Sequence, residues 1–100
     1  MNPVYAEVTI VGYGMSSCGA WTEARKNNKL DSLPYETWVQ GFLSGINSTG
    51  VMGIDILESG DHENWLVWID NYCQQKPLDK IYTGVSQLAD ELLKNCGCGE

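Results

Sequence analysis

The chain has 100 residues, which is enough for one domain with a modest core. Thirteen acidic against six basic residues give a net charge of −7, and this disfavours nucleic acid or an anionic membrane as a partner, since both need clustered cations. No apolar run approaches the roughly 18 residues of a membrane span, so we expect no membrane insertion. The acidity fits a basic protein partner and simple solubility equally well.

The N-terminal segment has the composition of a strand. Residues Val4 to Val11 are rich in β-branched and aromatic side chains, and Gly12 and Gly14 end the pattern. We predict an extended arm over residues 1–16, whose backbone would need a partner in this chain or in a second copy. No signal peptide is visible, but Val4-Tyr5-Ala6 resembles the end of a cleavage site, as in a mature form cut near its natural start.

Helical patterns follow the arm. Ser16 or Ser17 can cap a first helix that runs towards Asn27. The polar residues 27–29 are then expected to form a loop, with Asp31 and Ser32 as capping groups. Pro34 suits the first turn of a second, central helix, which residues 48–50 close.

The central helix has two distinct faces at 100° per residue. One is a broad apolar arc, and the other carries only small side chains. Glycine costs about 1 kcal/mol relative to alanine inside a helix, so glycines four residues apart predict a closely approaching neighbour; the alternative is glycine tolerated on a surface helix. The apolar arc comprises Tyr35, Trp38, Val39, Phe42, Leu43 and Ile46, and the small-residue arc Gly41, Ser44, Gly45 and Ser48.

The second half of the chain contains a glycine-rich stretch and two further helices. Within residues 51–61 we expect a short helix from Ile54 to Glu58. Asp61 can cap a third helix that ends before Pro77. The last helix runs from Asp79 to Gly97 and has the cleanest amphipathic pattern. The expected architecture is a compact all-α bundle of four to five helices, disulfide-stapled, with a single helical domain over residues 17–95 and a cysteine-containing tail over residues 96–100.

Four cysteines carry the strongest chemical signal. A bridge between Cys18 and Cys73 would close a loop of about 55 residues and contribute about 4 kcal/mol. Cys96 and Cys98 can bridge to each other, join another chain or pair with the first two, and sequence alone does not choose among the three connectivities. A redox dithiol at Cys96 and Cys98 and a four-cysteine zinc site are weaker alternatives, because neither has the usual thiol environment or ligand spacing.

No catalytic motif is present, and we expect the protein not to be an enzyme. His62 is the single histidine and is expected at the surface, in the first turn of the third helix. A cysteine–histidine pair would need it beside a reduced cysteine. Phosphate-binding glycine loops, nucleophile elbows and zinc-protease motifs do not occur. We predict no cofactor and no metal.

Three segments together resemble the Rap/Tai family of bacterial immunity proteins, which are similar in style to the small periplasmic acid-stress chaperones called HdeA. They are Ser17-Cys18-Gly19-x-Trp21, the central helix from Tyr35 to Asn47, and Trp68-Ile69-Asp70-Asn71-Tyr72-Cys73-x-x-x-Pro77-Leu78. The resemblance covers residues 17–93. It implies a small helical periplasmic or secreted protein with a disulfide between Cys18 and Cys73, a tendency to form homodimers, and a role in blocking cell-wall amidase toxins delivered by type VI secretion.

The resemblance implies inhibition by protein–protein binding, through a loop or dimer face that plugs an enzyme cleft. The candidate contact segment is Asn47 to Asp61, with Ser48, Thr49, Asp55 and Glu58 as polar contacts. The partner would be a peptidoglycan amidase toxin. Two alternatives stay open: an acid-stress chaperone like HdeA, or an uncharacterised secreted protein of the same fold.

Overall fold

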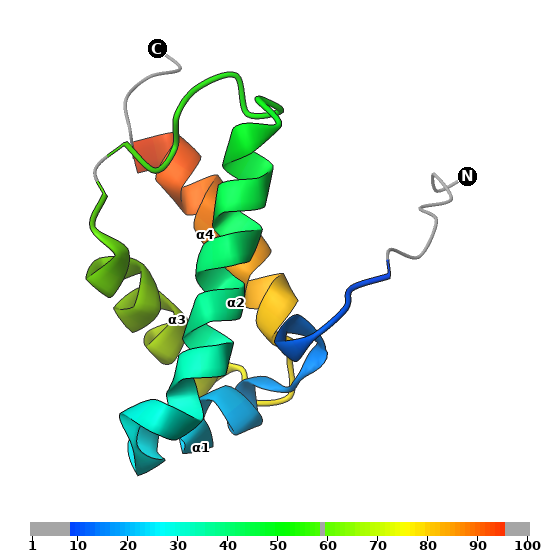
Figure 1. Cartoon of the computed structure of the whole chain (residues 1–100), viewed down its shortest axis with the longest axis vertical. Helices are drawn as coiled ribbons and strands as arrows, with labels where there is room; N and C mark the ends of the chain where they lie inside the picture. The colour runs from blue at the N-terminus through cyan, green and yellow to red at the C-terminus, as the bar shows by residue number, and fades with distance from the viewer. Residues whose placement is uncertain (1–8, 59, 96–100) are drawn as a thin grey trace.

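A computed structural model describes residues 9–58 and 60–95 and contains four α-helices (Figure 1). A 3-10 turn, η1 (Tyr13–Met15), precedes α1 (Cys18–Asn27), α2 (Lys29–Ser48), α3 (His62–Gln75) and α4 (Ile81–Asn95). The described residues hold no strand beyond one isolated antiparallel bridge between Ser17 and Lys80. The prediction of an all-α, disulfide-stapled bundle is confirmed.

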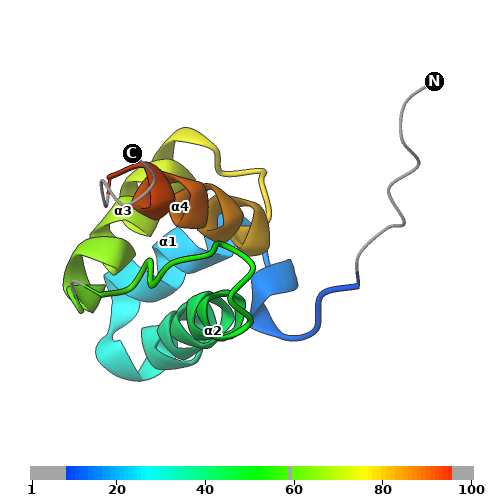
Figure 2. The same cartoon turned by 90° about the horizontal axis from the view of Figure 1, so that it is seen from above.

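The helices are arranged with α2 at one side of the bundle. It is the longest helix and packs against α1 and α4, while α3 packs against α1 and α4. Figure 2 looks along α2 and shows α3 and α4 side by side on one flank of it, with no helix on the opposite flank. One long face of α2 is therefore covered by no other helix of the described part of the chain.

The core lies between the four helices and is closed at one end by Ile56 from the loop after α2. Val39 and Leu43 of α2 are fully buried, as the apolar arc predicts, and Tyr35, Trp38, Phe42 and Ile46 pack around the core more peripherally. The other buried core members come from α1, α3 and α4: Cys18, Trp21, Trp65, Leu66, Ile69, Cys73, Ile81, Val85, Leu88 and Ala89.

The start of α2 differs from the prediction. The helix begins at Lys29, only one residue after α1 ends, and Pro34 lies inside it. The expected loop over residues 27–29 shrinks to Asn28, whose extended backbone and side chain cap the helix by accepting a hydrogen bond from the Asp31 N–H at 2.9 Å. Because this cap acts earlier than Asp31 or Ser32 could, the helix gains a full turn.

The prediction that a neighbour packs on the small-residue arc of α2 is wrong. Gly41 and Gly45 are exposed, and a Cβ added to either would meet no atom within 4 Å. The helices that pack against α2, α1 and α4, lie on its apolar side, so the small residues face outwards.

Close packing does depend on a glycine at Gly14. It is buried against the ring of Trp38, and a Cβ there would lie 2.1 Å from Cη2 of that ring. The Trp38 indole N–H also donates to the backbone oxygen of Val11 at 2.9 Å. Residues 13–15 therefore form a 3-10 turn held on α2, which corrects the expectation of an extended arm there; residues 1–8 lie outside the described part.

Replacing Gly14 with alanine is expected to lower the free energy of unfolding by about 1–3 kcal/mol, because the methyl group and the Trp38 ring cannot share the same space. The matched substitution Gly45→Ala is expected to be neutral or stabilising by up to about 1 kcal/mol, since it adds helix propensity in open space. Urea unfolding of both variants provides the measurement. Equal effects at the two positions would contradict the packing described here.

Candidate functional site

The disulfide joins Cys18, at the start of α1, to Cys73, near the end of α3. Their Cα atoms are 4.7 Å apart, and both side chains are fully buried. The predicted pairing is confirmed, and with these sulfurs bonded to each other the four-cysteine zinc alternative is wrong. Cys96 and Cys98 lie outside the described residues.

Backbone hydrogen bonds surround the disulfide and tie the start of α1 to the connection before α4. The Cys18 N–H donates to Asp79 O at 2.7 Å, and the Gly19 N–H donates to Pro77 O at 3.0 Å. In return the Ile81 N–H donates to Ser16 O at 2.9 Å. Segments far apart in the sequence are thus held at one point by both covalent and hydrogen bonds.

A charged cluster fixes the angle between α1, α2 and α3. Arg25 donates to both oxygens of Asp70 at 2.8 and 2.7 Å and to Glu36 Oε2 at 2.8 Å. Glu36 is only 2 % exposed and also accepts from Lys29 and from the Ser32 hydroxyl. Each charge in the cluster therefore has an opposite charge beside it, as burial requires. The Trp21 indole N–H completes the cluster by donating to Asp70 at 2.8 Å.

The cluster shifts the acidities of its members. Burial alone raises the pKa of Glu36, but the hydrogen bonds from Lys29, Ser32 and Arg25 outweigh it and hold the pKa below its usual value. The hydrogen bond to Asp70 raises the pKa of Arg25, despite the opposing effect of burial. Periodicity gives no sign of this cluster, because Glu36 lies on neither the apolar nor the small-residue arc of α2. The one available signal was the placement of Arg25, Lys29 and Glu36 around the junction of the first two helices.

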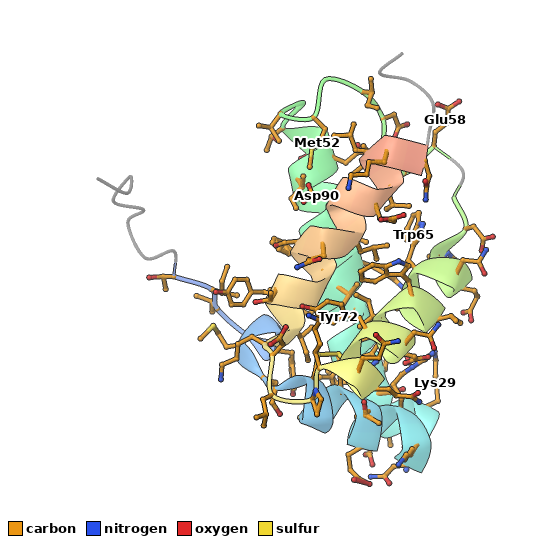
Figure 3. All side chains as sticks on the ribbon, turned by 180° about the vertical axis from the view of Figure 1, so that it is seen from behind. Lys29, Met52, Glu58, Trp65, Tyr72 and Asp90 are labelled. Atoms are coloured by element: carbon orange, nitrogen blue, oxygen red, sulfur yellow. A yellow bond between two sulfur atoms is a disulfide. The ribbon has the colours of Figure 1, made fainter. Side chains whose placement is uncertain are left out.

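The segment between α2 and α3 is a series of turns and not the short helix predicted for Ile54 to Glu58. Gly50, Gly53 and Gly60 have φ angles of 71°, 78° and 69°, a left-handed backbone that interrupts any helix. Ile56 is buried and Ile54 and Leu57 are partly buried, as expected for the stretch. Figure 3 shows Met52 and Glu58 at this end of the molecule, far from Lys29.

Asn47 holds this loop in shape. Its side-chain N–H donates to Asp55 Oδ1 at 2.8 Å, and its side-chain oxygen accepts from the Ile56 N–H at 3.0 Å. Asp55 also accepts from the Leu57 N–H at 3.1 Å. A single amide at the last turn of α2 thereby orders the middle of the loop. Sequence reasoning included Asn47 in the candidate segment without assigning it this role.

The four predicted contact residues are all exposed, but they differ in how their polar atoms are engaged. The hydroxyls of Ser48 and Thr49 donate to the carbonyls of Gly45 and Ile46 at 3.0 and 2.7 Å, so they cap the end of α2. Asp55 takes part in the link to Asn47 described above. Glu58 extends from the loop at the surface (Figure 3).

Two apolar hollows lie on the outer face of α2. The first, about 700 Å³, is lined by Phe42, Gly45, Ile46, Thr49 and Val51 and adjoins the loop. The second, about 490 Å³, lies at the other end of the helix and is lined by Tyr13, Leu30, Leu33, Pro34, Thr37 and Trp38. Two of these lining residues are strongly exposed: Val51 in the first hollow has 74 % of its surface exposed, and Leu30 in the second has 82 %.

His62 is exposed in the first turn of α3, with its ring centroid 6.4 Å from that of Trp65. Its predicted surface position is confirmed. Within residues 9–58 and 60–95, no group of three or more histidine, cysteine or acidic side chains is arranged to hold a metal ion. None of the helices in this part of the chain is both long and apolar enough to cross a bilayer.

Comparison with protein-family models, with curated proteins and with solved structures gives no match. The resemblance to the Rap/Tai family therefore stays a prediction, and the function has to be argued from the surfaces of this molecule alone.

Proposed function

We propose that this protein is a periplasmic inhibitor that acts by protein–protein binding, as an immunity protein that neutralises a cell-wall amidase. The observation that carries the proposal is the loop over residues 49–58, which is held by Asn47 yet presents Val51, Asp55 and Glu58 to solvent. A loop that is already ordered loses little conformational entropy when it enters an enzyme cleft, so more of its contact energy appears as affinity.

The rest of the scaffold supports an inhibitory role. Ile56 anchors the loop in the core, and the disulfide holds α1 to α3. A buried disulfide suits an oxidising compartment such as the periplasm. The net charge of −7 would draw a basic partner towards the molecule. Binding residues are often carried on loops that a rigid scaffold positions.

The test is inhibition of peptidoglycan hydrolysis by purified cell-wall amidase toxins, with purified sacculi as substrate. Replacing Glu58 with lysine is expected to weaken inhibition at least about tenfold, because it reverses a charge at the contact surface without touching the link to Asn47. Asp90→Lys makes the same charge change on the exposed face of α4 and is expected to leave inhibition within about twofold.

Two further results bear on the same proposal. Asn47→Ala should weaken inhibition while the helical content stays unchanged, because it frees the loop without removing a contact residue. Full inhibition by the Glu58→Lys variant, or no inhibition by the wild-type protein, would contradict the proposal. Protection of client proteins near pH 2 would instead favour the acid-stress chaperone.

We also propose that the protein is a homodimer formed through the outer face of α2. Between Leu30 and Thr49 this face carries no charged side chain. Two copies, each with a net charge of −7, can therefore meet there without bringing like charges together. Its residues are also placed symmetrically about the midpoint of the helix. In an antiparallel pair Leu33 would therefore face Ile46 of the second copy, with Gly41 near the crossing point. The face comprises Leu30, Leu33, Pro34, Thr37, Trp38, Gly41, Phe42, Gly45, Ile46 and Thr49.

Gly41→Arg is expected to convert a dimer into a monomer, because it places a bulky charge at the crossing point while leaving the core intact. Gln87→Arg, on the exposed side of α4, is the matched control and should stay dimeric. Sedimentation equilibrium at a protein concentration of about 100 μM distinguishes monomer from dimer when the dissociation constant of the dimer lies well below that concentration. A monomeric wild-type protein under these conditions would rule out the dimer.

A further inference from the structure

A separate hollow lies between η1, α1 and the start of α2, on a different side of the helix junction from the charged cluster. It measures about 430 Å³. Ala20 and Ala24, one turn apart on α1, are among the residues that line it, and their short side chains leave the space open. Tyr13 and Tyr35 border the same hollow, with their ring centroids 4.7 Å apart and their planes at 60°.

The charged residues that line this hollow are both acids. Glu23 of α1 and Asp31 of α2 both line it, together with Asn27. Glu23 makes no ion pair in the described part of the chain. Asp31 accepts through Oδ2 from the amides of Asn27 and Asn28, each at 3.4 Å, which leaves its Oδ1 open. Two carboxylates thus border the space without a cation between them.

Two of the nearby cations are held elsewhere, and the third, Lys26, is not among the residues that line the hollow. Arg25 and Lys29 are only two residues from Glu23 and Asp31 respectively, yet both are bound to Glu36, and Arg25 also to Asp70. No lysine or arginine is among the described residues that line the hollow. The charged residues at the junction of α1 and α2 therefore form two separate groups. On one side the cations are paired with Glu36 and Asp70, and on the other the carboxylates of Glu23 and Asp31 lie beside two tyrosine rings without a cation.

We propose that this hollow binds an alkylammonium group, the chemistry of a lysine side chain or of a free aliphatic amine. An ammonium ion is attracted both to carboxylates and to the faces of tyrosine rings. Its alkyl chain can lie along Ala20 and Ala24, whose methyl groups belong to the apolar part of the lining. A hard metal ion is a poorer fit, because it needs several converging oxygens and gains little from the rings.

This inference is independent of the proposed inhibitory function. The loop over residues 49–58 follows the last turn of α2, whereas the hollow lies at its first turns. Failure of the amidase assay would leave the ammonium site untouched, and failure of amine binding would leave the inhibitory loop untouched.

The test is nuclear magnetic resonance titration of the ¹⁵N-labelled full chain at low ionic strength. Pentane-1,5-diamine represents a free amine, and Nα-acetyl-lysine N-methylamide represents a lysine in a polypeptide. Both are expected to shift the amides of Tyr13, Glu23 and Tyr35, and the tighter ligand identifies the source of the ammonium group. 1-Pentanol, which has the alkyl chain without the charge, should leave these signals unchanged at the same concentration.

Two variants separate the site from general attraction to an acidic protein. Glu23→Gln and Tyr13→Leu are each expected to weaken amine binding about two- to fivefold, the size of one exposed ion pair or one cation–π contact. Asp90→Asn changes the net charge equally, far from the hollow in sequence, and should leave the affinity unchanged. Equal weakening by Asp90→Asn, or equal shifts with 1-pentanol, would overturn the proposal.

Discussion

Replacing both Cys18 and Cys73 with alanine is expected to lower the free energy of unfolding by about 4 kcal/mol. The disulfide joins residues 55 positions apart, and a cross-link over such a loop removes that much conformational entropy from the unfolded chain. Small domains have a total stability of roughly 5–15 kcal/mol. The variant should therefore lose between about a quarter and four-fifths of its stability.

Urea unfolding in a Cys96→Ser/Cys98→Ser background is the appropriate measurement, because reductant then acts only on the bond between Cys18 and Cys73. Addition of dithiothreitol should destabilise the protein with that bond by a similar amount and leave the double alanine variant unaffected. A loss below about 1 kcal/mol would mean that the hydrogen bonds around the start of α1 suffice to hold it in place.

Replacing Arg25 with methionine is expected to cost about 2 kcal/mol. It leaves the buried carboxylate of Glu36 and the carboxylate of Asp70 without their shared partner. The loss is smaller than for a fully enclosed pair, since Lys29 and Ser32 still donate to Glu36 and Asp70 is partly exposed. Lys26→Met, one residue along the same helix, removes an exposed charge and should change stability by less than about 0.5 kcal/mol.

The effect of Arg25→Met should depend on pH. The folded-state pKa of Glu36 is lowered, so its ionised form contributes stability that is present above its unfolded pKa of about 4.3 and is lost as the pH falls through the folded value. In the variant much of that contribution is already missing. The difference in unfolding free energy between wild type and variant should therefore narrow below about pH 4, and a constant difference from pH 7 to pH 3 would contradict this role of Glu36.

The number and order of the helices could be predicted because apolar periodicity and capping residues agree along most of the chain. Asp61 caps α3 and Ser17 caps α1 as the sequence suggests. The start of α2 was misplaced because Asn28 competes with two later capping residues, and the preference among them depends on how closely α1 and α2 join. Periodicity alone does not contain that tertiary constraint.

The candidate surfaces were less predictable for a related reason. Small residues on one face of a helix fit both a buried contact and an exposed one, and only the placement of the other helices shows that Gly41 and Gly45 face outwards. The cluster around Glu36 and the hollow beside Tyr13 each combine side chains from two or more elements that pack at specific angles. The loop was found from its glycines, but the role of Asn47 in ordering it depends on backbone geometry.

The position of the disulfide also has a mechanical consequence. Cys18 and Cys73 enclose α1, α2 and most of α3 in a covalent ring, while α4 lies outside it. A force that pulls the two ends of the oxidised chain apart is transmitted from Cys18 to Cys73 through the sulfur–sulfur bond. The backbone between these two residues is therefore not stretched. Under tension, α4 would peel away first, while the segment that carries the exposed loop would bear no load.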